Sequence, residues 1–363
     1  MGEFLNSNTQ LAIFLVLFFT FLFTYYLIPK IIKVVNHKQL MESPNDRSSH
    51  QELTPTFGGV SFYVILILVL LLINNLDGSD LSVNIIAGLT IILFTGLKDD
   101  LVVISHRSKL LGQLFAAILL LFNTKQYAFN LNGFLALYEV HPIAGFLVAL
   151  LMIIVIINAF NLIDGIDGLA ASIGIIVLSI FAFIYYQLGL YFFTFICASL
   201  IGSLLAFLRF NLSFKKKIFM GDTGSMIIGF IVSVLTINFL NLSADQLEGL
   251  QFIPKNSPFV LLAILIFPIF DMIRILMVRL TNKKHLLLAD KNHSHHVLLE
   301  RGNSHRKVSV MIGLISLIIS LLLLYLTSQV VNFWILFLVF LIAYLLFYAL
   351  FSKLSLDDKI NQY

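Results

Sequence analysis

Long apolar segments, separated by short polar ones, are the feature that most constrains this chain. A bilayer core of about 30 Å is crossed by roughly 20 apolar residues in a helix, and lipid offers no partner to an unsatisfied backbone group. We therefore expect an all-α polytopic membrane protein with about eleven transmembrane helices. The expected spans are 8–28, 57–74, 82–97, 109–123, 142–160, 168–187, 189–208, 224–243, 257–279, 307–327 and 331–351.

Composition excludes the other common classes. Hydrophobic residues make up 59% of the 363 residues and charged residues only 12%, whereas soluble domains carry about 25% charged residues. Cys197 is the single cysteine and lies in an apolar run, which excludes a disulfide scaffold. The longest polar stretches are 29–57 and 280–306, so we expect one integral-membrane domain over 1–363.

Basic residues predict the orientation of the spans. With the N-terminus outside, all 23 lysines and arginines except Lys125 and Lys255 fall in loops of the cytoplasmic face. This bias matches the positive-inside rule and places the C-terminus in the cytoplasm. Every histidine except His141 lies on that face too. Transporters usually hold such groups near mid-membrane, so we expect instead a site for a water-soluble substrate that meets a membrane-held one.

Four cytoplasmic clusters are candidates for this site. The first is Asp99-Asp100, followed by Lys109 at the start of the next span. Adjacent carboxylates repel each other and are typical of a metal site, a proton transfer or a cationic partner, while the lysine suits a phosphate. The alternative is a solvated acidic loop end.

The second cluster follows an apolar span and reads Asn161-Leu-Ile-Asp164-Gly-Ile-Asp167-Gly168. Its three oxygen-bearing side chains recur every third residue, so in a helical turn they would share a face. Carboxylate and amide oxygens suit Mg²⁺, which also keeps water and substrate phosphate as ligands. The alternative is a helix cap followed by a turn.

The third cluster, 219–225, reads Phe-Met-Gly-Asp-Thr-Gly-Ser, and Lys215, Lys216 and Lys217 precede it. We expect Asp222 and Thr223 at the N-cap of the following helix, where free N–H groups and the helix dipole favour phosphate. A plain cap is the alternative.

The fourth cluster holds His293, His295 and His296, with Arg301 nearby. One dense histidine run without cysteine is poor spacing for zinc. Imidazole and guanidinium groups equally suit a diphosphate, and a solvated loop is the third possibility. In the span before this loop, Asp271 and Arg274 predict a structural ion pair beside a kink at Pro268.

Together these clusters resemble the polyprenyl-phosphate N-acetylhexosamine-1-phosphate transferases, which are related to phospho-MurNAc-pentapeptide transferase. The resemblance covers nearly the whole chain and rests on motifs in the family's order: 44–50 with 54–59, Asp99-Asp100 with Lys109, NLIDGIDGLA, FMGDTGS, PIFD over 268–271, and the HSHH tetrad at 293–296. It implies transfer of N-acetylhexosamine 1-phosphate, GlcNAc 1-phosphate above all, from a UDP-sugar to undecaprenyl phosphate, with release of UMP. Such enzymes begin O-antigen, enterobacterial common antigen and teichoic-acid synthesis at the bacterial inner membrane.

The resemblance also implies roles for the first three clusters. Asn161 and Asp222 would ligate Mg²⁺, with Mn²⁺ as an alternative ion. Asp99 or Asp100 would deprotonate or position the lipid phosphate, which Lys109 would neutralise. Because a phosphate monoester has a second pKa near 6, we favour positioning. The residues expected at the nucleotide sugar are Phe219, Asn211, Asp164, Asp167, His293, His295, His296 and Arg301.

Two alternatives to this function remain open at the level of the sequence. One keeps the fold and takes UDP-MurNAc-pentapeptide, although the HSHH tetrad and the eleventh span disfavour it. The other is a transporter of a lipid-linked or nucleotide sugar. We expect no nucleic-acid partner, and a homodimer is left open.

Overall fold

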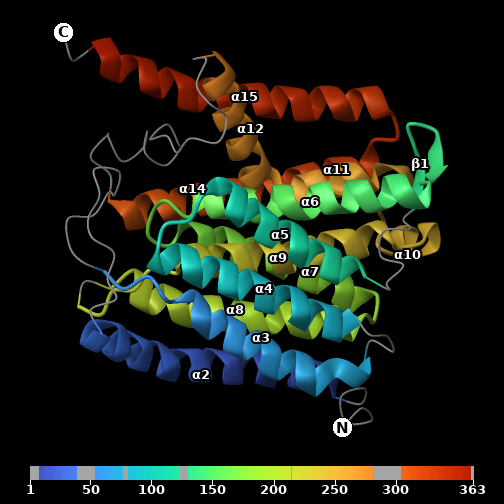
Figure 1. Ribbon diagram of the computed structural model, residues 1–363. Coiled ribbons are helices and arrows are strands. Elements are labelled where there is room, and N and C mark those ends of the chain that lie inside the picture. Colours follow the sequence, from blue (N-terminus) through green and yellow to red (C-terminus); the bar gives the residue numbers. More distant parts are fainter. Residues whose placement is uncertain are drawn as a thin grey trace.

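A computed structural model describes residues 8–38, 54–76, 81–122, 130–213, 215–281 and 304–360. Most of its helices lie side by side in one bundle with their long axes roughly aligned, and α12 crosses them (Figure 1). In chain order they are α2 (Thr9–Lys38), α3 (Gly59–Ile73), α4 (Leu81–Leu101), α5 (His106–Leu121), α6 (Pro142–Ile163), α7 (Leu169–Gln187), α8 (Tyr191–Asn211), α9 (Gly221–Leu240), α11 (Ser257–Ile264), α12 (Ile266–Thr281), α14 (His305–Gln329) and α15 (Phe333–Ile360).

Short elements complete the fold. They are the helix α10 (Ala244–Gly249), two 3₁₀ turns at Asn74–Leu76 and Pro254–Asn256, and an antiparallel hairpin of β1 (Asn130–Phe134) and β2 (Leu137–Glu139). The hairpin and α10 lie together at one end of the bundle (Figure 1). Neither the hairpin nor α10 is expected from the sequence, because both are short.

The predicted all-α polytopic architecture is confirmed. Within the described residues, eight helices are long and apolar enough to cross a membrane, or nine if α11 and α12 form one broken span. Each of the eleven predicted segments falls on a helix or on this pair. However, α5 has 16 residues and the apolar part of α15 is Phe333–Ala349, both short of the roughly 20 residues that a span needs. The count of eleven therefore stays a prediction.

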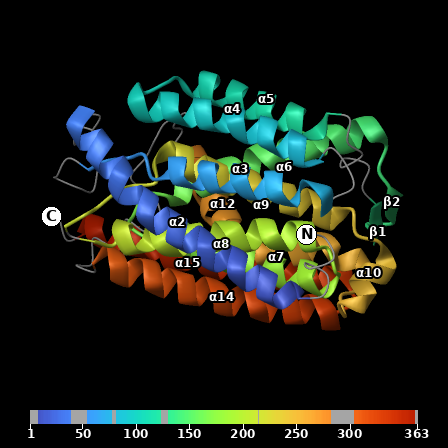
Figure 2. The ribbon, with the colours of Figure 1, turned by 90° about the horizontal axis from the view of Figure 1, so that it is seen from below.

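Helix α9 lies at the centre of the bundle and is the most completely buried of the candidate spans. It packs against α3, α4, α6 and α7, and Figure 2 shows α4 and α5 along one edge and α14 along the other. Glycines permit close approach here: a Cβ on Gly59 would lie 2.2 Å from the backbone nitrogen of Gly224. The beginnings of α3 and α9 are thus held in direct backbone contact.

The span 257–279 is broken rather than gently kinked. Its two halves, α11 and α12, meet at Leu265 with a bend of 73°. The bend precedes Pro268 because proline has no N–H to donate to the carbonyl of Ile264 four residues earlier. The expected ion pair is confirmed: Arg274 Nε lies 3.7 Å from Asp271 Oδ1, and both side chains are buried.

Candidate active site

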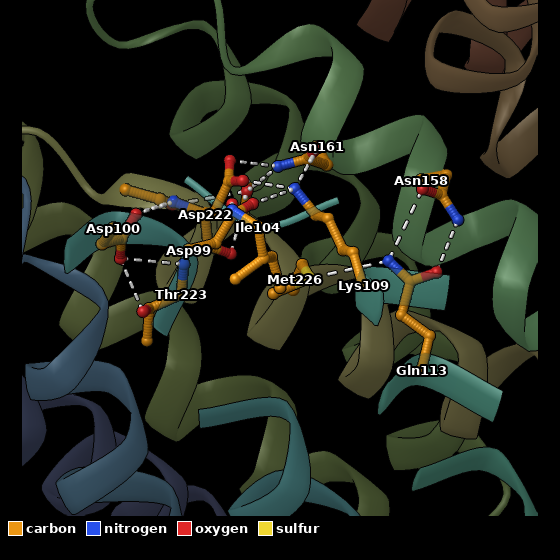
Figure 3. A network of polar contacts seen from close by, with 12 residues as sticks. Asp99, Asp100, Ile104, Lys109, Gln113, Asn158, Asn161, Asp222, Thr223 and Met226 are labelled. Carbon is orange, nitrogen blue, oxygen red and sulfur yellow. Dashed lines mark hydrogen bonds and ion pairs between the residues drawn. The ribbon is translucent and has the colours of Figure 1, made fainter. Parts of the chain in front are cut away.

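Polar side chains from four helices meet at the end of the bundle where α4 and α6 end and α9 begins (Figure 3). Helix α4 continues past its apolar part, so Asp99 and Asp100 stand in its last turn. Asp99 Oδ1 accepts the backbone N–H of Ile104 at 2.9 Å, and its Oδ2 lies 3.1 Å from Lys109 Nζ. The aspartate thus fixes the turn that leads into α5 and contacts that helix's lysine.

Asp100 caps helix α9, which differs from the capping expected from the sequence. The helix begins at Gly221, and Asp222 and Thr223 lie in its first turn rather than at its N-cap, where Met220 makes no side-chain cap. Asp100 Oδ1 instead accepts the N–H of Asp222 at 2.7 Å, and Oδ2 accepts the hydroxyl of Thr223 at 2.6 Å. A carboxylate is favoured there by the free amides and the helix dipole.

The backbone of Gly221 makes this cap possible. Its φ is +71°, in the left-handed region that glycine adopts without strain, and an added Cβ would lie 2.6 Å from Asp100 Oδ2. Only a residue without a side chain fits between the carboxylate and the carbonyl of Thr56.

Lys109 lies at the centre of the group that we call the Lys109 cluster: Asp99, Lys109, Asn161 and Asp222. Its Nζ donates to Asn161 Oδ1 at 3.1 Å and forms an ion pair with Asp222 Oδ2. Asn161 Nδ2 in turn donates to Asp222 Oδ1 at 2.7 Å and to Ser225 Oγ at 2.9 Å. Helices α4, α5, α6 and α9 each contribute one member, so the sequence expectation that these four side chains gather is correct.

The donor set of the cluster suits a hard cation. Oxygens of Asp99, Asn161 and Asp222 converge on one ammonium, and carboxylate and amide oxygens are ligands that Mg²⁺ prefers. Within the described ranges, no three His, Cys, Asp or Glu side chains are arranged to hold a metal ion. A Mg²⁺ here would therefore take few protein oxygens and complete its shell with water and substrate phosphate, which is its usual habit beside phosphates.

The second predicted cluster is divided by the structure, so the expectation of one shared face is wrong. Helix α6 ends at Ile163 with Asp164 as its C-cap, and Gly168 has a φ of +79°. The chain thus turns between Asn161, which contacts Asp222, and Asp167, whose Oδ2 accepts Lys217 Nζ at 2.6 Å. Spacing of three residues gives a shared face only while the helix continues.

Asp164 lies between these two groups. Its removal from bulk water, together with the negative charges of Asp222, Asp100 and Asp167, raises the pKa of its carboxyl well above the usual range. A bound cation would oppose this shift by favouring the charged carboxylate.

Asn211 connects the loops that carry Asp167 and Phe219. Its Oδ1 accepts the N–H of Gly168 at 2.6 Å, and its Nδ2 donates to the carbonyl of Ile218 at 2.9 Å. The ring of Phe219 lies 5.2 Å from Lys217 Nζ, and its backbone pairs with Pro55 and Gly58. Asn211 is buried, so it acts by holding these loops, and Phe219, Asp167 and Lys217 form a neighbouring group.

Part of the expected site lies outside the described residues. This applies to His293, His295, His296 and Arg301, and to most of the loops 29–57 and 280–306. One histidine that the sequence reasoning did not select, His305, places its Nδ1 3.9 Å from Asp167 Oδ2.

A second polar layer lies one helical turn deeper than the Lys109 cluster and was also missed. Gln113 follows Lys109 by four residues, Asn158 precedes Asn161 by three, and Asn158 Nδ2 donates to Gln113 Oε1 at 2.7 Å (Figure 3). The sequence did hold a signal for this layer. Gln113 and Asn158 are polar residues inside apolar spans, one turn from the candidate site, and polar groups are costly in lipid unless they have a partner.

Comparison with known proteins agrees with this arrangement. Residues 82–240, which include all four members of the Lys109 cluster, match the family model described as glycosyl transferase family 4. A probable undecaprenyl-phosphate N-acetylglucosaminyl 1-phosphate transferase of Bacillus subtilis (strain 168) is 31% identical over 87% of this chain and 86% of its own length. The chain belongs to glycosyl transferase family 4.

Other relatives in this family carry similar names. A decaprenyl-phosphate N-acetylglucosaminephosphotransferase of Mycobacterium leprae (strain TN) is 29% identical over 80% of this chain and 78% of its own length. An undecaprenyl-phosphate alpha-N-acetylglucosaminyl 1-phosphate transferase of Yersinia pestis is 28% identical over 84% and 82%. Membership in family 4 confirms the expected family. The chain is a membrane-embedded glycosyl-1-phosphate transferase, and this activity disagrees with the transporter alternative.

Proposed function

We propose that this enzyme transfers GlcNAc 1-phosphate from UDP-GlcNAc to undecaprenyl phosphate in the inner membrane of a bacterium. The observation that carries the proposal is the Lys109 cluster, in which carboxylate and amide oxygens surround an ammonium at a helix end, in a chain whose relatives are named for N-acetylglucosaminyl 1-phosphate transfer to polyprenyl phosphates. The product would begin a cell-surface polysaccharide.

The reaction is a phosphoryl transfer between two anions. An oxygen of the lipid phosphate forms a bond to the sugar-bearing phosphorus of UDP-GlcNAc, and the bond from that phosphorus to the oxygen of UMP breaks. The products are undecaprenyl-diphospho-GlcNAc and UMP. In such transfers positioning and charge neutralisation carry most of the catalysis.

The side chains divide these tasks. Asn161 and Asp222 would hold Mg²⁺, which neutralises diphosphate charge when bound. Lys109 would neutralise the lipid phosphate, and Asp99, already paired with this lysine, would orient its ammonium. Asp100 keeps Asp222 in place through the cap of α9, so of the two adjacent aspartates Asp99 is the one that faces the substrates.

The uridine end would lie against the neighbouring group of Phe219, Asp167 and Lys217. A ring beside a cation and a carboxylate provides both stacking and hydrogen bonding for a base. We place this site on the cytoplasmic face, where the nucleotide sugar is made available and where the basic loops lie.

Release of UMP tests the proposal. Purified protein in detergent is mixed with UDP-GlcNAc, with and without undecaprenyl phosphate and Mg²⁺, and UMP is quantified. We expect UMP only when all three are present. No turnover with any UDP-N-acetylhexosamine would overturn the proposal, and turnover with UDP-MurNAc-pentapeptide in place of UDP-GlcNAc would establish the peptidoglycan alternative.

A further inference from the structure

A cavity of about 830 Å³ opens between α2, α8 and the beginning of α14. Its volume lies within the roughly 300–1,000 Å³ of ligand pockets. We call it the arginine pocket. Its walls include Phe21 and Tyr25 of α2, Leu205, Leu208 and Arg209 of α8, and Arg306 of α14. No member of the Lys109 cluster, nor Asp167, Lys217 or Phe219, lines it, so the proposed transfer reaction makes no use of it.

The pocket is apolar at one end and cationic at the other. On α8, Leu205 lies one turn before Arg209, and on α2, Phe21 lies one turn before Tyr25, so each pair shares a helix face. Arg209 stands two residues before the end of α8, and Arg306 is the second residue of α14. The cationic end therefore lies at the membrane boundary, and the apolar end points toward the bilayer interior.

The two guanidinium groups are available for a ligand. In the part of the chain that the structure describes, neither Arg209 nor Arg306 has an acidic partner, whereas Lys217 is paired with Asp167. Both arginines are exposed. The planar fork of arginine matches phosphate oxygens, and here two forks from different helices border one cavity.

We propose that the arginine pocket binds a phospholipid with an anionic headgroup. Its phosphate lies between Arg209 and Arg306, and an acyl chain lies along Phe21 and Leu205. Basic pockets between transmembrane helices at a membrane surface recognise anionic lipids in this way. The polarity of the pocket matches that of a lipid in the surrounding leaflet, and an arginine that only anchors a helix end needs no apolar cavity beneath it.

A tryptophan placed in the pocket tests the proposal. Trp334 is the only tryptophan of the chain and is 72% exposed, so Trp334→Phe gives a silent background. In it, Leu205→Trp adds a reporter at a position that is 40% exposed and borders the pocket. Quenching is then titrated with brominated phosphatidylglycerol or brominated phosphatidylcholine in otherwise neutral bilayers.

We expect half-maximal quenching at an at least about fivefold lower mole fraction of phosphatidylglycerol than of phosphatidylcholine, because each basic residue near a membrane surface contributes a preference of this order. Arg209→Gln with Arg306→Gln should bring the two lipids to parity. The matched control is Lys30→Gln with Lys33→Gln, which removes two exposed charges of α2 outside the pocket and should keep the preference.

Three results would overturn the proposal. The first is equal quenching by both lipids in the parent protein, a comparison that needs no arginine variant to fold. The second is a preference that survives in the arginine variant. The third is an equal loss of preference in the lysine control, which would make surface charge alone responsible.

Discussion

The carboxylate of Asp100 accepts the backbone N–H of Asp222 at 2.7 Å, so that the last turn of α4 caps the first turn of α9. Asp222 belongs to the Lys109 cluster, and its backbone position is thus set by a residue of another helix. The adjacent carboxylate of Asp99 instead pairs with Lys109. Substitutions of the two neighbouring aspartates should therefore affect stability and activity differently.

Asp100→Ala should lower both thermal stability and kcat. Loss of a capping acceptor costs about 0.5–2 kcal/mol, and the first turn of α9 would no longer hold Asp222. Asp99→Ala should reduce kcat with a smaller loss of stability, because Asp99 does not cap this helix. Thermal unfolding in detergent and kcat are measured for both variants. Wild-type stability of Asp100→Ala would contradict the capping role.

Asp222→Ala should abolish turnover and leave the protein folded. The side chain is 34% exposed and contributes little to the buried part of α9. Asp222→Asn should be nearly as damaging, because Mg²⁺ requires the formal charge as well as the oxygen. Activity is assayed across a range of Mg²⁺ concentrations, with folding checked by size-exclusion chromatography. Wild-type activity at every concentration would show that the metal assignment is wrong.

Lys109→Gln should remove a charge-assisted contact at the lipid phosphate. Such contacts are worth roughly 1.5–3 kcal/mol, or about 10- to 150-fold in rate or lipid affinity. The KM for the UDP-sugar should change much less. Undecaprenyl phosphate is titrated at saturating UDP-GlcNAc.

Lys109→Arg separates this role from simple anchoring at the membrane surface. An anchor tolerates arginine, whereas a site shaped for a compact ammonium does not readily accept a planar fork. The lysine is 12% exposed and touches two carboxylates, which is unlike an anchor that extends into the headgroups. Near-wild-type kinetics for both variants would leave only the anchoring role.

Gln113→Leu should destabilise the protein and reduce kcat, because it takes the Oε1 acceptor from the Nδ2 of Asn158 one turn below Asn161. Asn158 Nδ2 keeps its bond to the carbonyl of Ile154, so the loss of this one hydrogen bond costs about 0.5–1.5 kcal/mol. Gln113→Leu combined with Asn158→Leu removes both partners and should recover much of the stability, which thermal unfolding measures. A double variant less stable than either single one would contradict the pairing.

Sequence reasoning predicted the apolar helices and the shared face of Asp99, Lys109, Asn161 and Asp222 because both follow local rules. Apolar length predicts a span wherever it occurs, and the positive-inside rule brought Asp99, Lys109, Asn161 and Asp222 to one face. Their convergence depends only on that shared face and on the packing of four helices.

Two predictions were wrong because the contacts of the residues were made by parts of the chain that are distant in sequence or by a helix end that spacing did not indicate. The cap of α9 was expected within its own first residues, but the acceptor stands 122 residues earlier in the chain. Asn161 and Asp167 were expected on one helical face, yet α6 ends between them, at Ile163 with Asp164 as its C-cap. The spacing of residues along one helix does not predict a contact with another helix of the bundle.

The order of these contacts along the chain also bears on biosynthesis. Lys109 and Asp222 are 113 residues apart, and a nascent polypeptide enters the membrane from its N-terminus. Helices α4, α5 and α6 therefore insert before α9 is made. At that stage Asp99, Asp100 and Lys109 lie at the water boundary without their partners from α9. When α9 arrives, it supplies a helix end for Asp100 and a carboxylate for Lys109 in the same event. An inserted chain that stops before Gly221 would be a set of membrane helices without the Lys109 cluster, so this cluster forms only after translation has passed that point.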